Sequence, residues 1–188
     1  MTESWDVRML TASYRRDGPQ EEPVVEIFGR TPDDRSITVE YRGFLPYFYC
    51  IEPTQALLSL LQRDPEVVRI ETKELEVAGV RRSCGKILIH HPWKTPEYRE
   101  RCKKYGCEIL AADIPFAHRF IFDLDLPSCF RVFGEPAQGR YTTQLIVRAD
   151  RFEPIEPFSP RLRILSFDIE NTMQNPKLLC IGIAWREK

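Results

Sequence analysis

The chain of 188 residues is long enough for one large or two small domains with a hydrophobic core. Its formal net charge of −1 excludes a whole-molecule attraction to nucleic-acid phosphates, so any such contact must come from a local group of lysines and arginines. No signal peptide and no long apolar run is apparent, and we expect a soluble, cytoplasmic protein with no membrane contact.

The cysteines favour ordinary reduced thiols over a metal site. No CxxC pair occurs, and although two of them could in principle ligate a metal, one is expected on the core face of a helix and the other at the start of a strand. The six cysteines are at positions 50, 84, 102, 107, 129 and 180.

The first forty residues predict a small antiparallel meander. Trp5 to Tyr14, Val24 to Phe28 and Ile37 to Tyr41 have the composition of strands. Arg15 to Glu22 contains Asp-Gly-Pro and Thr31 to Asp34 contains Thr-Pro-Asp-Asp, and both are typical of turns.

The next segment predicts strand, helix and two strands. Phe44 to Ile51 is an aromatic strand that contains a proline, which indicates an edge strand or a bulge. Pro53 to Arg63 places its alanine and leucines on one helical face. Val67 to Val77 alternates as a strand, and Ser83 to His90 returns after a glycine turn.

A second helix and strand follow. Thr95 has the residue type of a helix N-cap, with proline at the first helical position, and Gly106 supplies a left-handed exit. Cys107 to Ile114 then returns as a strand. Residues 44–114 therefore predict the β-α-β-β-α-β order of ferredoxin-like folds, which many single-strand RNA-binding modules share.

Two turns of this unit are the place where we expect a pocket. His91 to Thr95 and Asp113 to Phe116 follow the two strands that flank the second helix. If these strands pair side by side, the two turns lie near one another. The pocket would then be formed by two segments well separated in the sequence.

The remaining chain predicts the end of one domain and the start of another. Phe116 to Leu124 could be helical or extended, and two further strands are expected, Arg131 to Phe133 and Tyr141 to Phe152. Residues 154–160 contain three prolines in seven and form the best linker candidate.

Beyond the linker, Leu162 to Glu170 and Leu178 to Trp185 read as buried strands. A sheet of two strands without cover is half a domain, so we expect either a fragment or partner strands from another polypeptide.

The first of these strands carries two acids on one face, Asp168 and Glu170. Such a pair at a strand end could hold divalent metals in a phosphodiesterase site. Two acids are not a complete site, and a solvent-facing edge can show the same pattern, so the residues alone leave both interpretations open.

Basic and aromatic residues could form a surface for single-stranded nucleic acid, or they could be solvated helix charges and core aromatics. The three histidines are poor metal-ligand candidates. His90 and His91 are adjacent on the expected strand and so point to opposite faces, and His118 stands alone. The basic residues are Arg81, Arg82, Lys86, Arg99, Arg101, Lys103 and Lys104, and the aromatics are Tyr47, Phe48, Tyr49, Trp93 and Phe116.

Four blocks, in this order and at these spacings, resemble the N-terminal part of archaeal family B DNA polymerases. They are FLPYFYCI from Phe44, LIHHPWKTP from Leu88, CEILAADIPFAHRF from Cys107 and LRILSFDIEN from Leu162. The resemblance covers nearly the whole chain. It implies an α+β fold in which residues 1–153 form a template-binding domain with the ferredoxin-like core at 44–114, and residues 161–188 begin a truncated RNase H-like 3′→5′ exonuclease domain.

The resemblance also implies roles for individual residues. FDIE matches the first exonuclease motif, so Asp168 and Glu170 would be catalytic and would bind Mg²⁺. The family's N-terminal pocket captures uracil in single-stranded template DNA, and the matching positions are Met9, Pro46, Tyr47, Pro92, Thr95, Ile114, Pro115, Phe116 and Arg119. This chain departs from the family pattern at Thr95, where valine is frequent, and at Met9, where tyrosine is frequent.

We therefore expect a fragment of a DNA-directed DNA polymerase that neither polymerises nor degrades DNA by itself. Its partners would be template DNA, the rest of the polymerase chain and, through the missing part, a sliding clamp. The alternatives are a stand-alone single-stranded RNA- or DNA-binding module and an inactive structural subunit.

Overall fold

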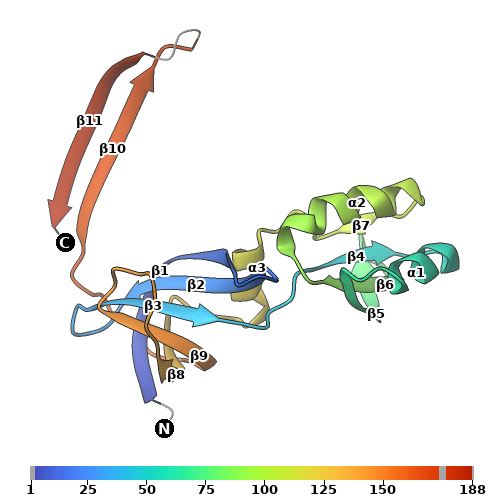
Figure 1. Ribbon diagram of the computed structural model, residues 1–188, viewed down its shortest axis with the longest axis horizontal. Helices are drawn as coiled ribbons and strands as arrows, with labels where there is room; N and C mark the ends of the chain where they lie inside the picture. Colours follow the sequence, from blue (N-terminus) through green and yellow to red (C-terminus); the bar gives the residue numbers. More distant parts are fainter. Residues whose placement is uncertain (1–2, 174–176, 188) are drawn as a thin grey trace.

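A computed structural model describes residues 3–173 and 177–187, which form an α+β protein built from three parts (Figure 1). A closed β-barrel lies beside a four-stranded sheet with two helices, and a long hairpin projects from the barrel. The barrel and the four-stranded module each have a hydrophobic core of their own.

The barrel combines strands from the beginning and the end of residues 3–154. Its strand order is β1-β2-β3-β9-β8, and all neighbours are antiparallel except β3 and β9, which are parallel. The predicted antiparallel meander is confirmed for the first three strands, and the two later strands close it into a barrel. The strands are β1 (Glu3–Asp17), β2 (Glu22–Arg30), β3 (Ser36–Tyr41), β8 (Cys129–Pro136) and β9 (Leu145–Pro154).

The core of the barrel forms from inward-facing apolar residues of every strand. Ile27 on β2, Val39 on β3 and Phe130 on β8 are fully buried and belong to one cluster. A β-bulge between Phe133 and Gly134 lets β8 approach β9 closely, since a Cβ at Gly134 would come within 2.0 Å of a main-chain oxygen of β9. Only glycine fits at this position.

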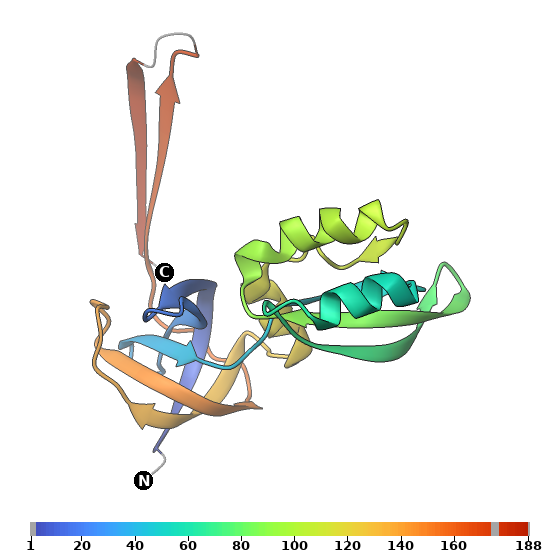
Figure 2. The ribbon, with the colours of Figure 1, turned by 45° about the vertical axis from the view of Figure 1, so that its right-hand side comes forward.

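The four-stranded module has the predicted ferredoxin-like topology. Its sheet order is β5-β6-β4-β7, all antiparallel, and both helices cover one face of the sheet (Figure 2). Phe48, Leu57 and Ile87 are fully buried between the sheet and the helices. The elements are β4 (Tyr47–Ile51), α1 (Gln55–Gln62), β5 (Val67–Val77), β6 (Val80–Ile89), α2 (Thr95–Lys104) and β7 (Ile109–Leu110).

Two strand predictions in this module were wrong. The strand with a proline begins only after Pro46, and it lies between β6 and β7 rather than at an edge. The strand expected from Cys107 to Ile114 is reduced to two residues, because Ala111 adopts a left-handed conformation (φ 58°) that ends the ladder. The two turns that flank the second helix still meet, but across β4, since β6 and β7 do not pair directly.

The predicted N-cap role of Thr95 was also wrong. A 3-10 turn, η1 (Pro92–Lys94), precedes α2 and continues into it, so that Thr95 has helical dihedrals (φ −50°, ψ −43°). Pro92 fills the first position of this turn, where a missing N–H costs nothing. The Thr95 side chain therefore does not cap the helix.

The segment of undecided structure is a helix, α3 (Phe116–Asp123), which lies where the barrel meets the four-stranded module (Figures 1 and 2). Phe120 is fully buried in the barrel core, and Phe116 belongs to the same cluster. Residues 155–162 contain no helix or strand, so the predicted linker at 154–160 lies in this segment except for Pro154, which ends β9, and its role as a linker stays a prediction.

The hairpin consists of β10 (Arg163–Asn171) and β11 (Leu178–Glu187), which pair in antiparallel fashion. All the described residues of both strands are exposed, including the large apolar ones. Across the described ranges, none of the helices combines the length and hydropathy that spanning a membrane requires. The six cysteines are free thiols, and only Cys180, on the hairpin, is exposed.

Candidate nucleic-acid interface

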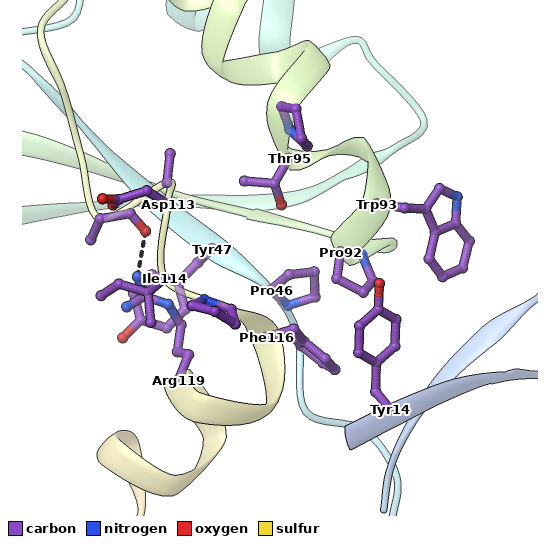
Figure 3. A pocket seen from close by; sticks show the side chains of 14 residues that line it. Tyr14, Pro46, Tyr47, Pro92, Trp93, Thr95, Asp113, Ile114, Phe116 and Arg119 are labelled. Atoms are coloured by element: carbon purple, nitrogen blue, oxygen red, sulfur yellow. Dashed lines mark hydrogen bonds between the residues drawn. The ribbon is translucent and has the colours of Figure 1, made fainter. Parts of the chain in front are cut away.

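A cavity of about 370 Å³ lies at the junction of the barrel and the four-stranded module, within the size range of small-ligand sites (Figure 3). Its lining comes from four segments: β1, the residues before and at the start of β4, the turn into α2 with the first residues of that helix, and the loop before α3 with the start of α3. The pocket predicted from the two turns is therefore present. We call it the junction pocket.

All the predicted pocket residues except one line this cavity. Met9 instead packs against the barrel core, and Tyr14 from the same strand takes a place in the lining. The Tyr14 ring meets the Phe116 ring edge to face, with 5.3 Å between centroids. The predicted residues that line the cavity are Pro46, Tyr47, Pro92, Thr95, Ile114, Pro115, Phe116 and Arg119.

Trp93 also lines the cavity, although the sequence identified it only as an aromatic of a possible nucleic-acid surface and not among the pocket residues. A partly exposed tryptophan in a proline-led turn is a signal that could have found it, because such a ring is costly to leave in water without a role. Figure 3 shows the Trp93 indole on the outer side of Pro92, beside Tyr14.

Two positive charges lie close to the Tyr47 ring. The Lys86 ammonium lies 3.8 Å from the ring centroid and the Arg119 guanidinium 4.2 Å from it. The Tyr47 hydroxyl donates a hydrogen bond to Asp123 Oδ1 (2.8 Å). Burial and this hydrogen bond raise the pKa of Tyr47 to about 12, so the hydroxyl stays protonated at neutral pH and the ring orientation is fixed.

Arg119 braces the loop that forms one wall. Its guanidinium donates to the main-chain carbonyl of Ala111, drawn as a dashed line in Figure 3. Ala111 is the left-handed residue at the start of the wall segment, so this hydrogen bond stabilises a conformation that the residue alone disfavours. Arg119 is 6% exposed and pairs with no carboxylate among the residues described here. The pocket therefore has a buried positive charge beside it.

Two helices begin at the pocket without side-chain caps. The N-cap positions are Lys94 for α2 and Pro115 for α3, and neither side chain accepts a hydrogen bond from the first turn of its helix. The first N–H groups of α3, from Phe116 onward, have no partner within the helix. Such groups favour hydrogen-bond acceptors and negative charge.

The chemistry of the lining suits a flat ring with polar edges. Proline, isoleucine and phenylalanine supply rigid apolar contact, and the start of α3 supplies main-chain donors for carbonyl oxygens. The Thr95 hydroxyl faces the same space and makes no hydrogen bond in the part of the chain that the structure describes.

The basic and aromatic residues that were predicted as a possible nucleic-acid surface do not form one continuous surface in the structure. On α2 three of the basic side chains pair with acids: Arg99 and Lys103 with Glu100, and Arg101 with Asp64. Phe48 is fully buried in the core. Of the predicted aromatic residues, Tyr47 and Trp93 of the junction pocket have a basic side chain over the ring.

Comparison with known proteins gives a consistent picture. The chain is 30% identical over 183 residues to DNA polymerase 2 of Aeropyrum pernix, covering 87% of this chain and 22% of that protein. It is 31% identical over 177 residues to a DNA polymerase of Archaeoglobus fulgidus, covering 89% of this chain and 21% of that protein. No protein-family model matches.

Among solved structures, the fold matches a family B DNA polymerase from the hyperthermophilic archaeon Pyrobaculum calidifontis. The TM-score is 0.73 at 24% identity, over 97% of this chain and 26% of that one. The chain is similar to the N-terminal part of archaeal family B DNA polymerases. The resemblance read from the four sequence blocks is thus confirmed, and the chain spans about a fifth of its curated relatives.

The residues that resemble the first exonuclease motif of family B polymerases lie on β10. Asp168 and Glu170 stand opposite Gly182 and Cys180 of β11 and share one face of the hairpin. Their oxygens suit Mg²⁺, but Asp168 Oδ1 accepts the Ile169 N–H (2.9 Å), and no cluster of three metal-ligand side chains occurs in residues 3–173 and 177–187. The pair fits part of a magnesium site, and its catalytic role stays a prediction.

Proposed function

We propose that this chain is the template-binding N-terminal part of an archaeal DNA polymerase, and that its junction pocket captures a uracil base from single-stranded template DNA. The observation that carries the proposal is the junction pocket itself. Apolar walls, main-chain donors and a buried arginine meet there, in a cavity of about 370 Å³.

Shape would provide the discrimination. Uracil and thymine present the same pairing edge and differ by one methyl group, so hydrogen bonds cannot separate them. Walls of Pro92 and Ile114 are stiff, because proline has a fixed φ and isoleucine is branched at Cβ. A rigid wall that excludes a methyl group discriminates by about 10- to 200-fold.

The cost of capture is small for this substrate. A base must leave its stack to enter the pocket, which costs a few kcal/mol, and less in a strand that is already single-stranded. Lys86 and Arg119 place positive charge beside the cavity, where it would attract the phosphates on either side of the captured base.

The test is fluorescence anisotropy with single-stranded DNA oligonucleotides that differ only in one central uracil or thymine. We expect the uracil strand to bind at least about tenfold more tightly. Equal affinity would remove the pocket proposal, because phosphate contacts do not distinguish the two strands. A matched RNA strand tests the rival function, a stand-alone RNA-binding module, which requires RNA to bind at least as well as DNA.

The proofreading activity and the sliding-clamp contact concern the whole polymerase, and we propose them separately from the junction pocket. Asp168 and Glu170 would supply carboxylates to a Mg²⁺ site for proofreading, a bound Mg²⁺ would activate water there, and a sliding clamp would bind elsewhere in the polymerase. We expect this chain alone to have no nuclease activity. A magnesium-dependent nuclease assay in which turnover disappears with Asp168→Ala would contradict that expectation.

A further inference from the structure

His91 connects the four-stranded module to the barrel immediately before the Pro92 wall of the junction pocket. β6 ends at Ile89, and His91 lies in the turn that follows, the first of the two turns from which the pocket was predicted. Its Nδ1 lies 2.8 Å from Glu66 Oε2, in the turn before β5. Its Nε2 lies 3.1 Å from the main-chain carbonyl of Gln20, in the turn between β1 and β2.

Both ring nitrogens of His91 thus face acceptors, a carboxylate and a carbonyl. A neutral imidazole has one N–H and satisfies one acceptor, whereas the imidazolium donates to both. Burial favours the neutral ring, but the hydrogen bonds to Glu66 and Gln20 outweigh it, so the pKa of His91 lies above its ordinary value.

Glu66 also fixes the main chain of the turn. Its Oε1 accepts the His91 backbone N–H (2.7 Å), and its carbonyl accepts the His90 N–H (3.0 Å). One carboxylate therefore holds the ring and the backbone of the residue that precedes Pro92.

A second contact joins the same turn to the barrel. The Arg16 guanidinium, near the end of β1, lies 3.9 Å from the Trp93 ring centroid. The Trp93 ring lies 4.7 Å from the His91 ring. The barrel thus holds the turn on both sides of Pro92, at His91 and at Trp93.

We propose that Glu66 and protonated His91 form a latch that fixes Pro92 against the barrel and so sets the width of the junction pocket. The proposal rests on the proposed function, because uracil preference is its functional readout. When His91 loses its proton, one of its two acceptors loses its hydrogen bond, and the wall is held less firmly. Glu66 is a positioning residue in this account, since it lies outside the pocket lining.

The acidic and basic groups near His91, other than His90, favour the protonated ring or are already paired. Glu21, in the turn between β1 and β2, adds a favourable negative charge and pairs with Arg16 at 3.0 Å. The remaining groups on the neighbouring segments are Glu22, which pairs with Arg42, Asp64, which pairs with Arg101, Lys94, which pairs with Glu97, and His90, whose ring centroid is 6.0 Å from that of His91.

The direction of the pH effect follows from the raised pKa. The contribution of His91 to the folded structure is fully present below its unfolded pKa of about 6.5 and is lost as the pH rises through the folded pKa. Uracil preference should therefore be strong in mild acid and weaker in mild alkali.

The experiment measures the ratio of uracil to thymine oligonucleotide affinity between about pH 5.5 and 8. Wild type is compared with Glu66→Gln, which keeps the side-chain size and an acceptor for the backbone N–H, and with Glu74→Gln, a matched change on the exposed part of β5. We expect the wild-type and Glu74→Gln ratios to fall about fivefold or more as His91 deprotonates. In Glu66→Gln the ratio should be low throughout and should vary little with pH.

A second readout makes the two proposals separable. Nuclear magnetic resonance follows the titration of His91 and the hydrogen-exchange protection of the Lys94 amide, which donates to the His91 carbonyl (3.1 Å). If the latch exists, the hydrogen-exchange protection of the Lys94 amide falls when His91 loses its proton and also in the Glu66→Gln variant. A pH-independent affinity ratio, or unchanged Lys94 protection while His91 titrates, would overturn the latch. Absence of uracil preference at every pH would overturn the proposed function, and the Lys94 protection would then decide the latch alone.

Discussion

The junction pocket and the β10–β11 hairpin use the same kinds of residue with opposite results. At the pocket, aromatic and proline residues from four segments bury one another, and Phe116 is 7% exposed. On the hairpin, Phe167 is 67% and Ile183 is 70% exposed, although both strands read as buried. An apolar pattern predicts that a strand is covered by other residues. Only the tertiary structure shows whether this chain provides that cover.

This difference has a direct energetic consequence, which the largest prediction uses. Phe120→Ala removes a fully buried ring from the barrel core and should lower the free energy of unfolding by about 3–5 kcal/mol. Phe167→Ala, the matched change on the hairpin, should alter it by no more than about 0.5 kcal/mol. Urea denaturation followed by circular dichroism measures both. A similar cost for the two variants would show that the hairpin ring is packed in solution.

Glycine provides a second contrast between the two regions. A Cβ at Gly134 would lie 2.0 Å from the Arg148 carbonyl oxygen, whereas a Cβ at Gly182 meets nothing within 4 Å. Gly134→Ala should therefore destabilise the protein by about 1–3 kcal/mol through forced separation of β8 and β9. Gly182→Ala should be neutral or slightly stabilising, since alanine costs less entropy in a strand. Thermal unfolding of both variants decides this, and equal melting temperatures would contradict the close approach at the bulge.

The smallest expected effect concerns a charged side chain that the barrel buries. The acidic side chains of the hairpin, in contrast, are exposed to solvent. Arg15 donates to Glu40 Oε1 (2.6 Å), and the Tyr141 hydroxyl lies 2.8 Å from the same atom. Burial raises the pKa of Glu40, but these hydrogen bonds outweigh it and hold the pKa below its ordinary range.

The sign of the resulting pH dependence is fixed. The stabilisation is present above the unfolded pKa of about 4.3 and is lost as the pH falls through the folded pKa. Glu40→Gln should therefore flatten the acid side of the stability profile, measured as the free energy of unfolding between about pH 7 and 3. Parallel profiles for wild type and variant would show that Glu40 takes no part in acid unfolding.

Local patterns predicted much of the four-stranded module. The alternation from Val67 to Val77 gave β5 with its ends, because Asp64-Pro65 and Gly79 bound it. Thr54 caps α1 by accepting the Leu57 N–H (3.3 Å), as the sequence rules for helix starts would have it. The same rules failed at Thr95, because a 3-10 turn begins three residues earlier at Pro92 and continues directly into the helix.

Non-local structure could not be read in this way. The barrel closes through parallel pairing of Val39 with Val147, two residues more than a hundred positions apart, and no local periodicity reports such a pair. The pocket residue on β1 was placed at Met9, but the register shift between Met9 and Thr11 and the course of the strand bring Tyr14 to the cavity. The remaining pocket residues were found because the family resemblance aligns the turns themselves.

The central claim is that the junction pocket reads a base. The most direct measurement compares Thr95→Phe, which fills the cavity from α2, with Glu97→Phe, a change of similar size on the exposed part of the same helix. The account predicts that Thr95→Phe brings the ratio of uracil to thymine affinity to about one, while Glu97→Phe keeps a ratio of about ten or more. An undiminished preference for uracil in Thr95→Phe would place the base elsewhere and contradict the account.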